Sequence, residues 1–308
     1  DELKQIIDDI YEHYPVSADP EITLEANPDD LNPQKVKELK GTLINRFSIG
    51  IQSFFPEDLI WMNRAHSSRE AESSVKRVQD AGFGNITVDL IYGYPLLSNE
   101  KWHSNIEQVL EFGVPHISAY SMTVEPATAL ASFISKGKQP AMNEAQSADQ
   151  FVILMESLND AGFEHYEISN FAQPGKYSRH NSNYWNGVPY LGIGPSAHSF
   201  KDNTRQWNVA NNPRYLDSIA KNIIPAEIEI LSESNRINEY IMTSLRTAAG
   251  MDLGRITEKF GDDYRSLIEN DLEKFANNGW VDQKGSLVKL TSNGKLYADH
   301  IASELFVE

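Results

Sequence analysis

Residues 86–92, with the sequence ITVDLIY, decide the fold class, because their apolar and β-branched side chains predict a strand. Segments of the same kind lie on either side of this strand. They are residues 46–52 (RFSIGIQ) and residues 116–122 (HISAYSM). A shorter strand is predicted at residues 21–25 (EITLE). Four strands are therefore expected in the first 122 residues.

Helical patterns separate these strands. We expect helices over residues 1–13, 33–40, 56–63, 69–81, 99–112 and 144–161. Strands that alternate with helices predict parallel βαβ units, and four such repeats fit either a barrel or an open α/β sheet. In both architectures ligands bind at the carboxyl ends of the strands.

The pattern changes after residue 230. Helices are expected at residues 235–248, 252–260 and 264–276, followed by a hairpin at 279–290 and a last helix at about 292–306. Helices followed by a small β wing are typical of a winged-helix module, so we predict two domains, residues 1–230 and residues 231–308. From Asn235 onward, nine Lys and Arg residues stand against twelve Asp and Glu residues. This balance favours a structural cap over a DNA-binding module.

Composition narrows the possible partners. Of the 308 residues 40% are apolar, which is ordinary for a globular protein. The net charge of −17 repels the phosphates of nucleic acid. No apolar run approaches the roughly 20 residues that span a bilayer, and no signal peptide pattern is present. We expect a cytoplasmic protein without stable membrane insertion and without a nucleic-acid partner. The oligomeric state stays open.

The sequence contains no cysteine. Disulfides and any Cys-ligated zinc or iron–sulfur centre are therefore excluded within these residues. The sequence begins with Asp1 rather than Met, directly in a predicted helix. We expect that a preceding part of the protein is absent from it.

Polar side chains stand at or near the ends of three predicted strands. Glu25 closes the first, Gln52 closes the second, and Asp89 interrupts the third. An acid in so apolar a run costs several kcal/mol unless it is paired or solvated. Carboxylates at strand ends can accept hydrogen bonds from sugar hydroxyls. The alternative is that each caps a helix or pairs with a base, but three on neighbouring strands favour a site.

Two further residues are candidates. Arg64 lies in MNRAH at the end of a helix, and a guanidinium can bind a carboxylate through two parallel hydrogen bonds. The position of Arg64 in the sequence alone favours an ordinary surface arginine over a carboxylate-binding one. His180 lies in the polar loop SRHNSNYWNG beside Tyr184 and Trp185, which makes it a candidate contact for haem or another planar ligand, although chemistry alone does not favour that role. Of the other histidines, we expect His13, His103 and His300 at the surface and His116 and His198 in the core.

An ordered series of motifs covers nearly the whole chain: LEANPDDL, NRFSIGIQSF, NRAH, GFGNITVDLIYGYP, HISAYSMTVEPAT, YEISNFAQPG, RHNSNYW and YLGIGPSAHSF. Together they resemble the radical S-adenosylmethionine (SAM) proteins related to oxygen-independent coproporphyrinogen III oxidase. The elements VEPAT at residues 124–128 and HNSNYW at residues 180–185 resemble the haem chaperone branch of this family more than the oxidases.

The resemblance implies a partial (β/α)6 TIM-like barrel that binds SAM and a [4Fe–4S] cluster at the strand ends. The family's CxxxCxxC cysteines and GGTPS-like segment are missing, so we expect a barrel without its first strands and a cluster only in the full-length parent. The resemblance implies that Glu25, Gln52, Arg64 and Asp89 contact SAM, with Arg64 on the methionine carboxylate and Asp89 on the ribose hydroxyls or amino group. It makes His180 the candidate haem ligand.

Two functions follow from the resemblance, and enzymatic activity stays undecided. The preferred one is a haem chaperone that binds haem and passes it to apo-proteins such as respiratory enzymes. Cations and aromatic residues for haem are available between residues 176 and 207, at Lys176, Arg179, His180, Tyr184, Trp185 and Arg205. The alternative is the oxidase, in which a radical made from SAM converts coproporphyrinogen III to protoporphyrinogen IX. A DNA-binding protein is a third reading that the charge disfavours.

Overall fold

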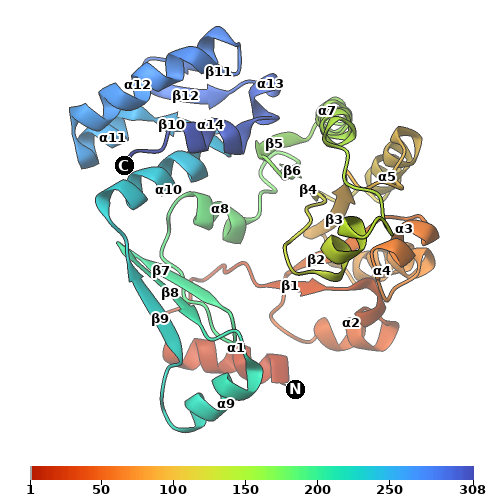
Figure 1. Ribbon diagram of the computed structural model, residues 1–308. Helices are drawn as coiled ribbons and strands as arrows, with labels where there is room; N and C mark the ends of the chain where they lie inside the picture. The colour runs from red at the N-terminus through yellow and green to blue at the C-terminus, as the bar shows by residue number, and fades with distance from the viewer. Residues whose placement is uncertain (1) are drawn as a thin grey trace. The chain divides into compact units, whose positions relative to one another are not determined.

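The computed structural model describes residues 2–308 (Figure 1). The described chain divides into two compact units. The first ends at Ser178 and the second comprises Arg179–Glu308. The domain boundary predicted at residue 230 stays a prediction.

The first unit is built on a six-stranded sheet with the strand order β1-β2-β3-β4-β6-β5 (Figure 1). Its strands are β1 (Thr23–Ala26), β2 (Arg46–Gln52), β3 (Ile86–Tyr92), β4 (His116–Ser121), β5 (Glu164–Glu167) and β6 (Asn170–Ala172). Strands β1 to β4 are parallel, which confirms the predicted α/β class with a parallel sheet. Strands β5 and β6 add an antiparallel hairpin, because only two residues join them and a parallel crossover needs about a dozen.

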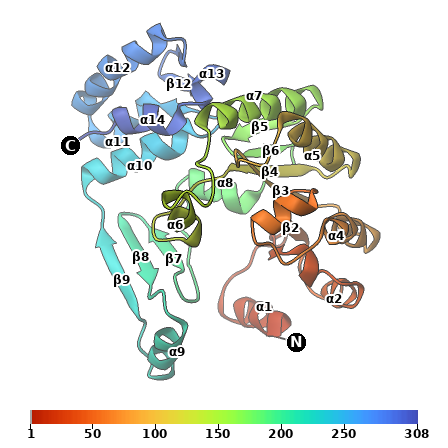
Figure 2. The same ribbon diagram turned by 45° about the vertical axis from the view of Figure 1, so that its right-hand side comes forward.

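The helices of the first unit are α1 (Glu2–His13), α2 (Pro33–Leu39), α3 (Pro56–Trp61), α4 (Ser68–Asp80), α5 (Asn99–Glu111), α6 (Ala129–Ser135) and α7 (Glu144–Asp160), with a 3-10 turn η1 (Pro28–Asp30) after β1. Six of these helices lie at the predicted positions, and α6 was not predicted. Local chemistry sets where they begin: Ser67 and Glu70 form a reciprocal capping box at α4, and Ser98 caps α5. Figure 2 shows α4 and α5 on one side of the sheet.

The two faces of the parallel strands differ in polarity, because successive side chains of a strand point to opposite faces. One face is apolar and fully buried, as Phe47, Ile49 and Ile51 illustrate on β2. The alternate residues of the same strand, Arg46 and Ser48, are polar. Burial of the apolar face therefore stabilises the sheet through the hydrophobic effect, and the side chains of the opposite face make polar contacts.

The second unit contains a three-stranded antiparallel sheet, β7-β8-β9, that the sequence analysis did not predict. Helix α8 (Arg179–Trp185) precedes β7 (His198–Lys201) and β8 (Thr204–Asn208), and α9 (Asn212–Ala220) leads to β9 (Ala226–Ile230). These strands are short and mostly exposed or half-buried, so their sequences lack the apolar run from which a strand can be predicted. His198 is exposed, so the prediction that it belongs to the core is wrong.

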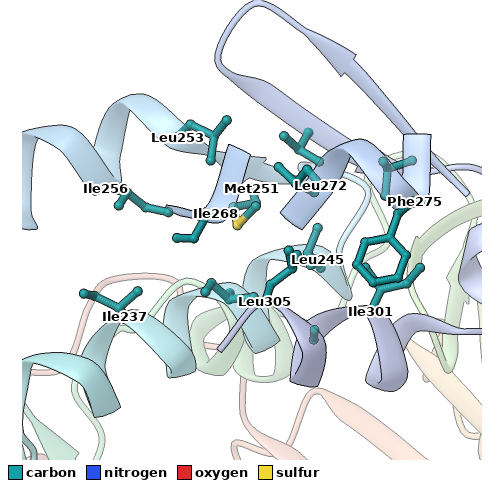
Figure 3. Close-up of a cluster of buried hydrophobic side chains, with 14 residues drawn as sticks. Ile237, Leu245, Met251, Leu253, Ile256, Ile268, Leu272, Phe275, Ile301 and Leu305 are labelled. Carbon is teal, nitrogen blue, oxygen red and sulfur yellow. The ribbon is translucent and has the colours of Figure 1, made fainter. Parts of the chain in front are cut away.

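The remainder of the second unit matches the predicted helices and hairpin. Its elements are α10 (Glu233–Leu245), β10 (Met251–Asp252), α11 (Leu253–Phe260), α12 (Asp262–Asn277), β11 (Val281–Lys284), β12 (Leu287–Leu290), α13 (Ser292–Lys295) and α14 (Ala298–Glu304). The predicted last helix is thus two shorter ones. Figure 3 shows the apolar core that these elements share, with Ile237 from α10, Ile256 from α11 and Leu305 beyond α14 converging on it.

Candidate ligand sites

A row of polar side chains crosses the first three strands on the polar face of the sheet. Glu25 of β1 lies in register with Ser48 of β2. The Ser48 hydroxyl lies 3.2 Å from both carboxylate oxygens of Asp89 on β3. Asp89 in turn lies in register with Ser118 of β4. Glu25 and Asp89 are thus brought to the same face, as the strand-end argument predicted.

The Asp89 carboxyl has an unusual affinity for protons. Its burial in the sheet raises its pKa to about 6, the charge of Glu25 adds to the rise, and hydrogen bonds from Ser48 and Ser118 oppose it. A ligand that donates hydrogen bonds to this carboxyl would favour its ionised form. Hydroxyl and amino groups are donors of this kind.

Arg64 lies at the carboxyl end of β2. Its Nη2 donates to the carbonyl oxygen of Gly50 at 3.1 Å and to Oδ1 of Asn27 at 2.6 Å. Both acceptors are neutral, and within residues 2–308 Arg64 has no ion-pair partner. Its Nε is buried without a hydrogen-bond partner in the same range. The guanidinium is therefore placed to receive an anionic group.

Gln52 ends β2 in a strained conformation. Its φ is +68°, in the left-handed region, and the pairing of β2 with β3 shifts register between Ile49 and Gln52. A methyl group added at Gly50 would lie 2.8 Å from Nε2 of Gln52 and 3.3 Å from Nη2 of Arg64. Both side chains thus lie over a backbone that only glycine leaves open. Strained backbone of this kind clusters at functional sites.

The structure places Glu25 and Asp89 in one row on the polar face of the sheet, and Gln52 and Arg64 beside Gly50 near the carboxyl end of β2. The contact of these four residues with SAM stays a prediction. Their chemistry fits a ligand with a carboxylate and several hydroxyls, because Arg64 has an unpartnered buried Nε and the strand ends supply acceptors. A [4Fe–4S] cluster does not fit this chain's own residues. The sequence has no cysteine, and residues 2–308 contain no group of three metal-ligating side chains.

Sequence reasoning missed a second polar row on the same face. Arg46 donates through Nη2 to the Thr87 hydroxyl, and Thr87 lies in register with His116. His116 lies 2.7 Å from the hydroxyl of Tyr166, and burial lowers the pKa of its imidazole to about 3. His116 is buried, as predicted. The alternation of Arg46, Ser48 and Gly50 with apolar residues could have shown that this face is polar.

The prediction that His180 lies in a polar loop is wrong, because residues 179–185 form the short helix α8 of the second unit. The side chain of His180 is exposed. Its Nε2 lies 3.1 Å from the hydroxyl of Tyr184, and the two rings are nearly perpendicular at 4.8 Å. Tyr184 also packs edge-on against Tyr190 at 4.5 Å. His180 is therefore the first member of a chain of ring contacts.

A cavity of about 710 Å³ lies within the second unit and is lined by both tyrosines. Its aromatic lining is completed by Trp185, Phe200, Tyr240 and Phe260. Four cationic residues also line it, namely Arg205, Arg236, Arg255 and Lys259. Only Arg205 was among the predicted cations, because the other three lie on helices α10 and α11, far from the motif in sequence. A cavity lined by aromatic rings together with charged groups is suited to a small molecule that has an apolar body and charged substituents.

Comparisons with known proteins define the class. The profile of the Radical SAM superfamily matches residues 1–113, and that of the HemN C-terminal domain matches residues 231–297. The fold resembles that of coproporphyrinogen III oxidase (HemN) from Escherichia coli, with a TM-score of 0.81 and 20% identity over 99% of this chain and 74% of that one. The chain is thus a radical SAM-type α/β protein with a HemN-type C-terminal domain.

Sequence relatives narrow the class to a family. Heme chaperone HemW of Bacillus subtilis (strain 168) is 34% identical over 98% of this chain and 80% of that protein. Heme chaperone HemW of Mycobacterium tuberculosis (strain ATCC 25618 / H37Rv) is 32% identical over 98% and 76%, and that of Escherichia coli (strain K12) is 29% identical over 99% and 79%. The chain belongs to the HemW family, which confirms the resemblance drawn from its motifs.

No helix within residues 2–308 is both long enough and apolar enough to cross a bilayer.

Proposed function

We propose that this protein is a haem chaperone, which binds haem and passes it to apo-proteins such as respiratory enzymes. The observation that carries the proposal is the position of His180 next to Tyr184, a wall residue of the aromatic cavity, in a chain of the HemW family. Haem has a flat apolar body, an iron atom and two carboxylates. The cavity and its surroundings offer aromatic rings, an imidazole and cations for these three features.

His180 would bind the iron through a ring nitrogen. The hydroxyl of Tyr184, 3.1 Å from Nε2, orients the imidazole. A hydrogen-bond partner of this kind fixes the tautomer and tunes the basicity of a ligating histidine. Because the His180 side chain is exposed, the iron can reach it without a rearrangement of the core.

We also propose that the first unit binds SAM through Glu25, Gln52, Arg64 and Asp89. Bound SAM would supply an adenosyl group, a reactive sulfonium and a methionine moiety at the carboxyl ends of the strands. Arg64 would bind the methionine carboxylate through its remaining N–H groups, and Asp89 would accept hydrogen bonds from hydroxyl or amino groups. The [4Fe–4S] cluster of radical SAM proteins would need ligands that these residues do not include.

The alternative function, conversion of coproporphyrinogen III, has weaker support. It depends on a shared fold at 20% identity, whereas the more similar relatives carry the heme chaperone name. DNA binding by the winged-helix-like part is disfavoured by its acidic balance.

The test is a haem transfer assay with the haem-loaded protein. We expect the transfer rate to rise with the concentration of a haem-free b-type respiratory subunit, because direct delivery needs an encounter. Capture by apomyoglobin should proceed at a rate independent of its concentration, set by spontaneous dissociation. The same concentration-independent rate for both acceptors would rule out a chaperone. His180→Ala should reduce haem loading, followed by the Soret band.

A further inference from the structure

The cavity of the second unit is positively charged although the chain as a whole carries a net charge of −17. Four cations line it, against the two carboxylates of Asp202 and Glu239. Glu239 is already engaged, because its Oε1 lies 2.7 Å from Nη2 of Arg205. Three cations and Asp202 remain, which leaves an excess of two positive charges.

The packing of α10 and α11 presents these cations to the cavity. Ile237 and Ile241 of α10 and Ile256 of α11 are fully buried in the core that Figure 3 shows. The opposite side of α10 carries lining residues at helical spacing: Arg236, Glu239, Tyr240 and Thr243. On α11 the lining residues are Arg255 and Lys259, one turn apart. The core therefore fixes the helix faces that bear the cations.

Two of the three remaining cations are oriented by aromatic rings. The Arg236 guanidinium lies 5.1 Å from the ring centre of Phe260, and that of Arg255 lies 5.0 Å from the ring centre of Tyr240. Such stacking holds a guanidinium in place while its N–H groups stay available to an anion. Throughout residues 2–308, Arg236, Arg255 and Lys259 have no ion-pair partner.

We propose that Arg236, Arg255 and Lys259 bind the two carboxylates of haem, whose flat body lies along the aromatic wall between this cluster and His180. The proposal rests on the proposed haem function and adds the groups that recognise the propionates. The charge excess matches the two negative charges of the ligand. Tyr184 belongs both to the cavity wall and to the contact with His180, so the iron ligand and the cationic cluster adjoin one continuous surface. The C-terminal domain is thereby assigned a role in binding the ligand, beyond that of a structural cap.

The first experiment needs no variant. Iron protoporphyrin IX and its dimethyl ester share the iron and the ring, but the ester lacks the charges. Titration of the protein with each, followed by the Soret band, should give about tenfold tighter binding of the diacid, because charge-assisted hydrogen bonds to carboxylates are the strong ones. Equal binding of diacid and diester would overturn the proposal.

The second experiment locates the preference. The triple variant Arg236→Gln/Arg255→Gln/Lys259→Gln should bind the diacid about tenfold more weakly, leave diester binding unchanged and keep the Soret position set by His180. The control Arg214→Gln/Lys221→Gln/Lys284→Gln changes the net charge equally, at exposed residues of the same unit that do not line the cavity. It should behave as the wild type. A triple variant that keeps the full preference would overturn the assignment.

The outcomes separate this inference from the proposed function. Diacid preference without transfer to a respiratory subunit would leave the carboxylate site and remove the chaperone. Transfer without diacid preference would leave the chaperone and remove the carboxylate site.

Discussion

The hydroxyl of Ser48 lies 3.2 Å from both carboxylate oxygens of Asp89, so the two residues join neighbouring parallel strands on the polar face of the sheet. Asp89 nevertheless has a pKa of about 6, because burial and the nearby charge of Glu25 outweigh this contact. Ionisation of the Asp89 carboxyl is therefore unfavourable compared with that of an exposed carboxyl when no ligand is bound.

Asp89→Asn should change the pH dependence of stability. The folded pKa lies above the unfolded value of 3.8, so the folded state binds more protons between about pH 4 and pH 6, and stability falls as the pH rises through that window. Asparagine removes this loss, and we expect the variant to be more stable than wild type by about 1–3 kcal/mol at pH 7. Urea unfolding at pH 4.5 and pH 7 measures the difference. An equal pH slope in both proteins would show that Asp89 ionises normally.

Gly50→Ala should weaken SAM binding more than it lowers stability. The added methyl group meets Nε2 of Gln52 at 2.8 Å and Nη2 of Arg64 at 3.3 Å, so both side chains must move away from the strand end. We expect roughly tenfold weaker binding of SAM by equilibrium dialysis, with a stability cost of about 1–2 kcal/mol. Gly84→Ala is the matched control, because a Cβ there meets no atom within 4 Å. SAM affinity unchanged in Gly50→Ala would remove these residues from the site.

The sequence predicted the strands that form apolar runs and missed several that do not. Strands β2, β3 and β4 are apolar runs between helical patterns, and the structure has them at nearly the predicted residues. Strand β8 (TRQWN) is half-buried along most of its length, so it lacks the apolar run that marks a core strand. Strands β5 and β6 turned antiparallel because of the short connection between them.

The candidate sites also differ in how far they could be predicted from the sequence. The shared face of Glu25 and Asp89 could be predicted from sequence, because both lie on neighbouring parallel strands, and their role in a ligand site stays a prediction. The cations Arg236, Arg255 and Lys259 could not be predicted. They come from two helices whose orientation depends on the buried core, and no local pattern distinguishes them from exposed basic residues.

Asp58 should be essential for the stability of the first unit. It is fully buried and accepts hydrogen bonds from Ser53, Tyr94 and Lys101, with Lys101 Nζ at 2.6 Å from Oδ1. Asp58→Ala leaves the buried hydroxyls of Ser53 and Tyr94 without their acceptor, while Lys101 keeps its ion pair with Glu57 at 2.8 Å. We expect a loss of about 2–4 kcal/mol in the free energy of unfolding.

The matched control for Asp58 is the exposed pair of Lys4 and Asp8, which has the same distance of 2.6 Å. Asp8→Ala should cost less than about 1 kcal/mol, because solvent screens that pair. Equal effects of the two substitutions in chemical denaturation would contradict the difference in burial.

His116 should make stability fall in acid. Burial, with the charge of Arg46 adding to it, lowers its pKa to about 3, so between about pH 6.5 and pH 3 the unfolded state binds the extra proton and stability falls as the pH falls. At pH 5 this group alone accounts for a loss of about 2 kcal/mol relative to pH 7. His116→Gln removes the titrating group, so its unfolding free energy should depend less on pH over this range. A steeper dependence in the variant would refute the assignment of a neutral imidazole.

Tyr184→Phe separates the orientation of His180 from the packing of the cavity wall. The substitution keeps the ring that contacts Tyr190 but removes the hydroxyl that lies 3.1 Å from Nε2 of His180. We expect haem to dissociate about three to ten times faster and the Soret maximum to shift, because an unoriented imidazole is a weaker iron ligand. Binding of iron-free protoporphyrin IX should be unchanged, since the wall and the cations remain. His180→Ala should show the larger effect on haem and likewise none on the metal-free ring. If Tyr184→Phe instead weakened binding of both porphyrins equally, the hydroxyl would act on the cavity rather than on the histidine.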